Sequence, residues 1–271
     1  MKRLGILTAA ILVFLMFVVP FKALAATVAE LEGLTEPTQK DLSWKVGLGV
    51  AAVPDYEGSE DYTAAPIPLL SVMSKSGRSV ELLGNVLRAN ILPSNTWRFG
   101  PMLRYRAERD DDVDNDKVAK MEKVDAAAEL GAYAGFEINN WIFRVDVAQD
   151  VSDAHDGLLA SAAIGYTWPV NPWKFTLMGM TSYADDDYMS TYFSVSAADS
   201  AASGLRRYEA DSGFKDVGAQ FMVGYKLTEN WGITGALRYT RLLGDAADSP
   251  LVEDEGDENQ LLLGLLVSYS F

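Results

Sequence analysis

The chain contains no cysteine and only one histidine among its 271 residues. The absence of cysteine excludes disulfide bonds, thiolate catalysis and cysteine-bound metal ions. Basic residues are also few, since 23 lysines and arginines stand against 38 aspartates and glutamates, for a formal net charge of −15. A chain this acidic repels nucleic acid, so no nucleic-acid partner is expected. Nothing in the composition implies a bound cofactor.

Long apolar runs are absent except at the N-terminus. Lys2 and Arg3 precede an apolar stretch over residues 4–21, and residues 23–25 then place small side chains in an A-x-A pattern. This layout predicts a secretory signal peptide over residues 1–25, cleaved after Ala25. An uncleaved membrane anchor is the alternative, because about 18 apolar-dominated residues nearly span a bilayer. No later stretch is long and apolar enough for a helical membrane span.

The remaining apolar residues alternate with polar or small ones. An apolar side chain stands at every second position from Trp44 to Val50 and again from Leu261 to Phe271. The same period of two, with interruptions, recurs over residues 97–106, 124–137, 141–148, 157–168, 173–183, 215–227 and 231–241. Runs of about ten residues with this period, bounded by turn residues, indicate strands of a membrane β-barrel. The sequence therefore predicts an all-β fold, a closed antiparallel transmembrane β-barrel over residues 43–271, preceded by a periplasmic arm over residues 26–42.

The number of strands depends on two ambiguous regions. Residues 78–92 fit either one bent strand or a tight pair around Gly84-Asn85, and the beginning of 196–213 fits a short helix from Ala197 to Ala202 better than a strand. Both chain ends are expected in the periplasm, which requires an even number of strands. We predict about 12 strands, or 14 if both regions form strands.

Three short turns predict the register of the hairpins that contain them. The turns are Asn139-Asn140, the loop 228–230 and the segment 169–172. In each hairpin the paired residues fall on the same face, whereas a slip by one residue would separate them. The predicted pairs are Ile138 with Trp141, Phe136 with Phe143, Tyr225 with Ile233, Phe221 with Leu237, Trp168 with Trp173, Tyr166 with Phe175, and Ile164 with Leu177.

The two ends of the predicted barrel differ. Tryptophans lie beside the three short turns, as in an interfacial girdle, and the opposite connections, at 107–122, 150–156, 184–189 and 244–259, are mostly longer and acidic. Short periplasmic turns and long outer loops are typical of bacterial outer-membrane barrels. Tyr269 and Phe271 resemble the C-terminal signal that barrel assembly machinery reads. The expected location is the outer membrane, in contact with its lipid and lipopolysaccharide.

Catalytic and metal-binding residues are few. His155 lies in a short acidic loop and no G-x-S-x-G motif is present, so Asp156-Gly157 is interpreted as ordinary turn chemistry rather than part of an active site. The acidic run 110–116 fails the EF-hand pattern, because the twelfth position is Met121 or Lys123 and no glycine stands sixth. We predict solvated acidic loops, and no catalytic, cofactor-binding or metal-binding residue.

Charged residues on the inward face have two interpretations. They form either a pore lining that selects by charge or cross-strand pairs that fill the lumen and cancel one another. The second is favoured slightly, because Arg98, Arg104 and Arg106 are expected to face acidic residues of the next strand and a barrel of this size is largely filled. The candidate lining residues are Arg98, Arg104, Arg106, Asp125, Glu129, Glu137, Arg144, Asp146 and Arg238.

Several motifs resemble those of the MipA/OmpV family of outer-membrane proteins, the MltA-interacting protein family. The most specific are Pro-Asp-Tyr-Glu-Gly-Ser at 54–59 and Gly-Asp-Ala-Ala-Asp-Ser-Pro at 244–250, and the resemblance covers essentially the whole chain after residue 25. The residues that carry it are Pro54, Asp55, Tyr56, Glu57, Gly58, Ser59, His155, Asp156, Gly157, Tyr188, Gly244, Asp245, Asp248, Ser249 and Pro250.

The resemblance implies a non-enzymatic outer-membrane protein, since no position matches a family catalytic residue. The family's namesake is described as a scaffold that joins a lytic transglycosylase to a murein synthase, and these two enzyme classes are the expected partners. A porin-like channel for small solutes and an adhesin or antigen are the alternatives. For a scaffold, the expected partner surface is the periplasmic face, including residues 26–42 and 197–204.

Overall fold

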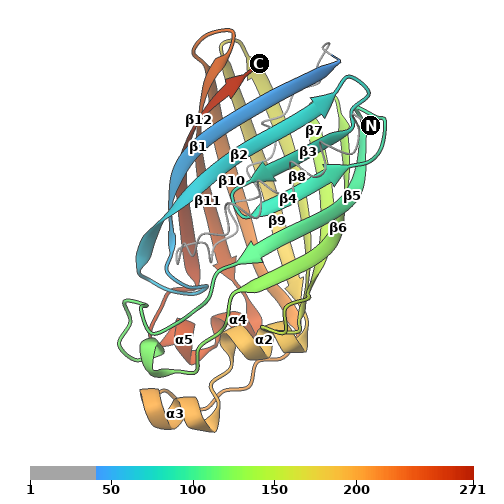
Figure 1. The fold of residues 1–271 in the computed structure, drawn as a ribbon. Coiled ribbons are helices and arrows are strands. Elements are labelled where there is room, and N and C mark those ends of the chain that lie inside the picture. Colours follow the sequence, from blue (N-terminus) through green and yellow to red (C-terminus); the bar gives the residue numbers. More distant parts are fainter. Residues whose placement is uncertain (1–40) are drawn as a thin grey trace.

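A computed structural model describes residues 41–271 of the chain. The predicted signal peptide and nearly all of the predicted arm therefore lie outside the described residues. The described part forms a closed barrel in which every strand pairs antiparallel with the next and β1 pairs with β12 (Figure 1). Its strands are β1 (Leu42–Pro54), β2 (Tyr62–Ser74), β3 (Ser79–Leu83), β4 (Val86–Asn90), β5 (Trp97–Arg106), β6 (Ala127–Ile138), β7 (Trp141–Asp150), β8 (Leu158–Val170), β9 (Trp173–Ala184), β10 (Gly213–Lys226), β11 (Trp231–Leu242) and β12 (Asn259–Ser270).

Of the two ambiguous regions, the first forms strands and the second does not. Residues 78–92 form the tight pair β3 and β4, and Gly84 turns the chain between them with φ of 56°, a value that glycine adopts without strain. The stretch after residue 196 begins with helix α3 (Ala197–Ser203) instead of a strand. The prediction of an all-β barrel with about 12 strands is confirmed.

The register agrees with two of the three predicted hairpins. Ile138 pairs with Trp141 across Asn139-Asn140, and Tyr225 pairs with Ile233 across the loop 228–230. The third prediction is wrong by two residues, because Trp168 pairs with Phe175 and Tyr166 with Leu177. Strand β8 continues through Pro169 to Val170, and the turn consists only of Asn171 and Pro172. A shift of two residues leaves every side chain on its predicted face.

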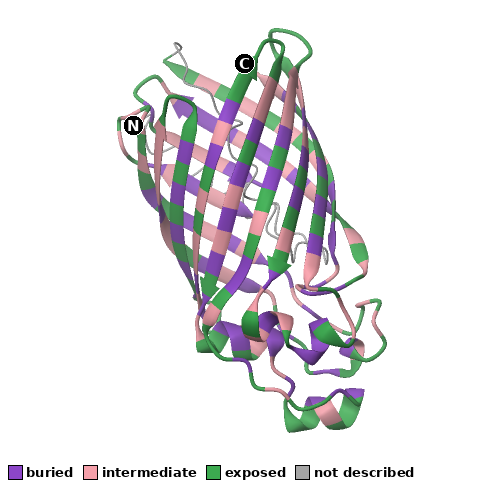
Figure 2. Ribbon diagram, turned by 180° about the vertical axis from the view of Figure 1, so that it is seen from behind, coloured by how far each residue is buried: buried purple, intermediate pink, exposed green. Residues whose placement is uncertain are grey.

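The outer surface of the barrel is apolar at alternate positions. In β12, Leu261, Leu263 and Leu265 are 47–63% exposed, whereas Leu262 and Leu266 are buried. Figure 2 shows the same alternation along neighbouring strands. Exposed leucines of this density are stable only against lipid. Among residues 41–271, no helix is long and apolar enough to cross a membrane.

The helices gather at one end of the barrel, opposite the short turns and the C-terminus (Figure 1). They are η2 (Val118–Lys120), α2 (Asp186–Phe193), α3, α4 (Gly244–Ala247) and α5 (Pro250–Glu253). Strand β9 leaves the short turn at 171–172 and runs to the opposite end, so α2 and α3 emerge with the long acidic loops. The expectation that residues 197–204 belong to the periplasmic face is therefore wrong.

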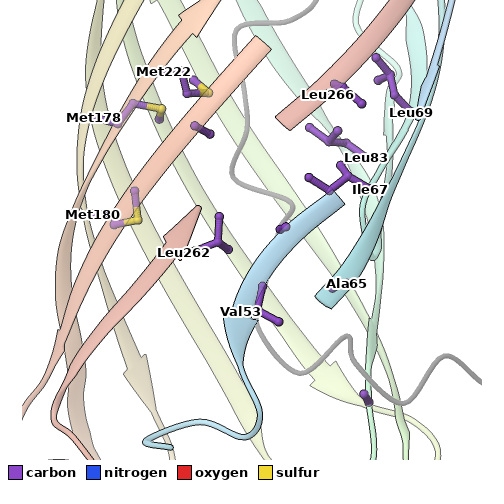
Figure 3. Packing of buried hydrophobic residues seen from close by; sticks show 13 residues of the cluster. Val53, Ala65, Ile67, Leu69, Leu83, Met178, Met180, Met222, Leu262 and Leu266 are labelled. Carbon is purple, nitrogen blue, oxygen red and sulfur yellow. The ribbon is translucent and has the colours of Figure 1, made fainter. Parts of the chain in front are cut away.

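The lumen is not filled by charged residues alone. Thirteen buried apolar residues, twelve from the neighbouring strands β9 to β12 and β1 to β3 and the other Ala107, form a cluster inside it, which we call the lumen cluster (Figure 3). It consists of Ala51, Val53, Ala65, Ile67, Leu69, Leu83, Ala107, Met178, Met180, Met222, Ala236, Leu262 and Leu266. The alternation did not reveal it, because β2 and β12 carry apolar residues on both faces.

Candidate functional site: a charged chamber beneath a helical cap

The helices at the outer end form a cap, which we define as α2 to α5, η2 and the loops that join them to the strands. Asp185 caps the start of helix α2, and its side chain accepts a hydrogen bond from the Tyr188 amide. Its inner face buries Tyr188 and Phe193 completely, in one apolar cluster with Leu242 of β11 and Val252 of α5. Burying two large aromatic side chains holds the cap firmly on the barrel.

The most specific motif, residues 54–59, lies where the cap meets β12. The Gly58 amide donates to Gln260 Oε1 at 3.3 Å, and Gly58 itself has φ of 99°, which favours glycine. Ser59 forms a bridge with Gly256, and the side chain of Tyr56 is buried in the cap. These contacts turn Glu57 towards the mouth of the barrel.

The motif 244–250 belongs to the other side of the cap. Gly244 and Asp245 begin α4, and the Asp245 carboxylate accepts a hydrogen bond from the Asp211 amide at 2.8 Å. Ser249 precedes Pro250 at the start of α5, and its buried hydroxyl donates to the Phe193 carbonyl at 2.6 Å. Asp248 is exposed. The motif thus joins α4 and α5 to the end of α2.

Glu57 is the contact between the cap and the charged interior. Its carboxylate accepts a hydrogen bond from the Tyr188 hydroxyl at 2.7 Å and is paired with Lys215 of β10. Arg106 Nη1 lies 3.8 Å from Glu57 Oε2, and the Arg106 guanidinium lies over the Tyr188 ring at 4.9 Å from its centroid. Three segments that are distant in the sequence therefore meet on one carboxylate.

Beneath this contact lies a buried ionic network on β5, β6 and β7. Arg104 donates to Glu129 Oε2 at 3.1 Å and to Asp146 Oδ2 at 3.0 Å. Arg106 Nε donates to the second oxygen of Glu129 at 2.7 Å, and Arg144 Nε lies 3.4 Å from Asp146 Oδ1. All five side chains are at most 5% exposed. Each carboxylate has more than one cationic partner, as buried charges require.

The remaining predicted lining residues lie apart from this network. Arg98 and Glu137 form a separate pair at 2.7 Å, towards the short-turn end of β5 and β6. Arg238 donates to Gln220 Oε1 at 3.0 Å. The prediction that Asp125 lines the lumen is wrong, because β6 begins only at Ala127 and Asp125 is exposed in the loop before it.

Sequence reasoning missed two residues of the interior, Lys215 and Asp216. They are adjacent in the chain and both buried, with the Lys215 ammonium 2.8 Å from Asp216 Oδ2. Strict alternation would turn one of them outward, but the register shifts between Phe214 and Asp216. Such a β-bulge places two successive side chains on one side. No pattern in a single sequence marks this bulge.

Between the cap and the network lies a chamber of about 110 Å³. Four cationic and two anionic side chains line it together with apolar residues from β8, β9, β11 and β12. The charged residues are Arg104, Arg106, Lys215, Arg238, Glu57 and Asp216. A volume of this size holds a few water molecules or one small polar group.

The single histidine closes a turn and supports the network. His155 Nδ1 accepts a hydrogen bond from the Gly157 amide at 3.0 Å, and its ring packs edge-on against Tyr188 and Tyr192. Its Nε2 lies 3.4 Å from Glu129 Oε1. A β-carbon at residue 157 would lie 2.3 Å from the Tyr188 amide nitrogen, so glycine is required there.

The loop around this histidine is held by Asp150. One oxygen of its carboxylate, Oδ2, accepts hydrogen bonds from the amides of Ala154, His155 and Asp156 at 2.7–3.1 Å. The exposed Asp156 has φ of 54°, in the left-handed region that aspartate tolerates in turns. This geometry agrees with the interpretation of residues 155–157 as turn chemistry.

The electrostatics of the cap depend on burial and on a few charges. Burial by itself raises the pKa of the Glu57 carboxyl, but the charges of Lys215 and Arg106 outweigh it, so that its pKa lies below the usual 4.5. Burial also raises the pKa of the Tyr188 hydroxyl well above 10. The tyrosine is therefore a hydrogen-bond donor and the glutamate an acceptor at neutral pH.

The acidic runs at 110–116 and 253–258 belong to the loops and helices of the cap. In the first run, Asp111 pairs with Lys123, and in the second Glu255 pairs with Lys117. Within residues 41–271, no group of three or more histidine, aspartate or glutamate side chains is arranged to hold a metal ion.

The C-terminal pair lies at the opposite end of the barrel. The Tyr269 ring packs edge-on against Trp231 at 5.0 Å, and the Phe271 amide donates to the Trp44 carbonyl at 2.9 Å. Phe271 itself is 57% exposed. Both aromatic side chains belong to the rim with the short turns.

Comparison with known proteins gives consistent results. The family model described as MltA-interacting protein MipA matches residues 46–271. Outer membrane protein OmpV of Vibrio cholerae is 27% identical over 200 residues, which cover 72% of each chain. MltA-interacting protein of Escherichia coli is 27% identical over 122 residues, which cover 45% of this chain and 48% of that protein. A solved outer membrane channel from Pseudomonas putida F1 aligns with 88% of this chain and 98% of its own, with a TM-score of 0.48 and 12% identity.

Several of the relatives are named outer membrane proteins, and the barrel carries the lipid-facing surface that this location requires. The protein is thus an outer-membrane β-barrel, as predicted. Because the family model spans the barrel from the first strand to the last residue, the chain belongs to the MltA-interacting protein MipA family.

Proposed function

We propose that the protein is a non-enzymatic interaction barrel that holds murein-processing enzymes at the outer membrane. One observation carries the proposal: the outer end is covered by the cap and the interior is occupied by the ionic network and the lumen cluster. A barrel filled in this way serves better as an anchor than as a passage. The name of the relative from Escherichia coli supplies the partner class, a lytic transglycosylase, and a murein synthase is the second proposed partner.

The partner site is proposed at the end with the short turns. Murein lies on the periplasmic side of an outer membrane, so enzymes that process it reach only that end. The turns there are short, and the exposed Ile91 and Leu227 stand at its rim. Because such turns offer little area for a stable complex, residues 26–42 are proposed to contribute the rest.

A binding experiment tests this directly. The full-length barrel in detergent is immobilised and exposed to a purified lytic transglycosylase, and then to a murein synthase. We expect capture that is lost when residues 26–40 are deleted, or is weakened at least tenfold by Ile91→Glu. The matched control is Arg206→Glu, an exposed substitution on the cap, which should leave capture unchanged. Equal capture by all variants, or none by the wild type, contradicts the proposal.

A channel for small solutes is the second candidate. The observation that favours it is the set of charged side chains along the inner wall, including Arg104, Arg106 and Glu129. It predicts single-channel conductance in planar bilayers, with an ion selectivity that changes when Arg104 is replaced by glutamate. Clear conductance together with no enzyme capture would reverse the order of the two candidates.

A further inference from the structure

The chamber beneath the cap is charged on part of its wall and apolar on the rest. Arg104, Arg106 and Lys215 line it, and each is at most 4% exposed. Met180 and Leu262 line it as well, and both also belong to the lumen cluster (Figure 3). The charged chamber and the apolar interior are therefore continuous.

Two nitrogens of the arginines that line this chamber lack a hydrogen-bond acceptor within residues 41–271. Within this range, Arg104 Nε and Arg106 Nη2 are buried and make no hydrogen bond, whereas Arg104 Nη1, Arg104 Nη2 and Arg106 Nε each donate to a carboxylate. A buried donor without an acceptor costs about 1–3 kcal/mol. Guanidinium groups bind phosphate and carboxylate oxygens strongly, so an anionic group in the chamber would relieve this cost.

The barrel wall is weakest beside the outer half of β2. Strand β3 pairs only with residues 69–73 of β2, and the Pro68 carbonyl accepts the last hydrogen bond, from the Gly84 amide at 2.9 Å. The backbone carbonyl of Pro66 points to the same side of β2 as the carbonyl of Pro68, but it lies beyond the end of β3. Proline has no N–H group to offer there. Within the described chain, residues 62–67 of β2 have no strand partner on this side.

This part of the wall adjoins the lumen cluster. Elsewhere in the barrel wall, separating two neighbouring strands would break a row of backbone hydrogen bonds. Within the described chain, the β3 side of residues 62–67 has no such row. The side chains of Ala65 and Ile67, from this stretch, are fully buried in the lumen cluster. The cluster also contains three methionines, whose flexible side chains rearrange easily around an apolar guest.

We propose that the barrel binds an anionic single-chain amphiphile from the membrane, of the alkyl phosphate or fatty acid class. Its anionic group occupies the chamber with Arg104, Arg106 and Lys215, and its chain lies along the lumen cluster and enters beside β2. A free anion of the same chemistry, such as inorganic phosphate, would occupy only the chamber and would not contact the lumen cluster. The proposal does not depend on the binding of murein enzymes.

The test uses a matched pair of substitutions at Thr240, a residue of β11 that lines the chamber without belonging to the ionic network. Thr240→Glu adds a negative charge at the chamber, and Thr240→Gln adds nearly the same volume without charge. The barrel in an uncharged detergent is titrated with dodecyl phosphate, inorganic phosphate or dodecyl maltoside, and native mass spectrometry counts the bound molecules. A difference in gel migration between heated and unheated samples shows that each variant is folded.

We expect one dodecyl phosphate per barrel, bound at least tenfold more tightly than inorganic phosphate or dodecyl maltoside. Thr240→Glu should weaken this binding about tenfold, because the added carboxylate repels the anionic group of the ligand, and Thr240→Gln should change it less than threefold. Equal binding of inorganic phosphate would overturn the role of the alkyl chain. Equal effects of the two substitutions, or no saturable binding, would overturn the site.

Discussion

At the scale of single residues, Glu57 connects the cap to the barrel. Its carboxylate joins Tyr188 of α2, Lys215 of β10 and Arg106 of β5. Glu57→Gln keeps an acceptor for Tyr188 but leaves the buried Lys215 with Asp216 as its only carboxylate partner within the described chain. Losing one charge-assisted hydrogen bond to the buried ammonium costs about 2 kcal/mol. We expect faster proteolysis of the cap loops, whereas Glu137→Gln, which breaks the half-exposed pair at the other end, should not accelerate it.

The same residue predicts a dependence on pH. Because the pKa of Glu57 in the folded protein lies below its usual value of 4.5, its contribution to stability is complete above about pH 4.5 and is lost as the pH falls towards the folded pKa. Hydrogen exchange of the cap, measured from pH 7 to pH 3 and corrected for intrinsic rates, should therefore accelerate below pH 4.5. The difference between wild type and Glu57→Gln isolates this group from other carboxyls. A difference that stays constant with pH contradicts the assignment.

At the scale of elements, α3 depends on a capping box that also attaches it to the loop before β6. Asp199 accepts hydrogen bonds from the Ser196 hydroxyl and from the Glu122 amide, both at 2.7 Å, and Ser196 in turn accepts from the Asp199 amide. Asp199→Ala should cost about 1 kcal/mol locally. Hydrogen exchange should then rise in residues 197–204. Asp187→Ala, an exposed residue in the first turn of α2, is the control, and an equal rise in α3 for both variants would refute the prediction.

Some features of the strands and turns could be predicted from the sequence and others could not. Alternation was enough for most of the strands, for the faces of most of their side chains and for two hairpin registers, because it reports directly which side of a strand meets lipid. It could not place the bulge at Lys215, or the turn at Asn171-Pro172, because both are settled by pairing with a neighbouring strand. The meeting of residues 57, 188 and 215 depends on contacts across the barrel mouth, which no local pattern encodes.

At the scale of the whole molecule, two barriers lie in series along the barrel axis. The cap closes the outer end through its own apolar cluster, and the lumen cluster fills part of the interior with buried side chains, nearly all from β9 to β12 and β1 to β3. An outer-membrane pore needs a continuous aqueous lumen. Either barrier alone interrupts this aqueous lumen. Removing both barriers should therefore raise the conductance by more than the sum of the two single removals.

This arrangement predicts how conductance responds to deletions. Replacing residues 186–212 by a short glycine-serine linker removes α2 and α3 and so opens the outer barrier, but leaves the lumen cluster in place. In planar bilayers, the wild type and this deletion should both show little conductance. Adding Met178→Ser and Met222→Ser, which make the lumen cluster polar and smaller, should produce open channels only in the deletion background. Large conductance from the cap deletion alone would mean that the lumen cluster is no barrier, and the cap would then be the gate of a channel.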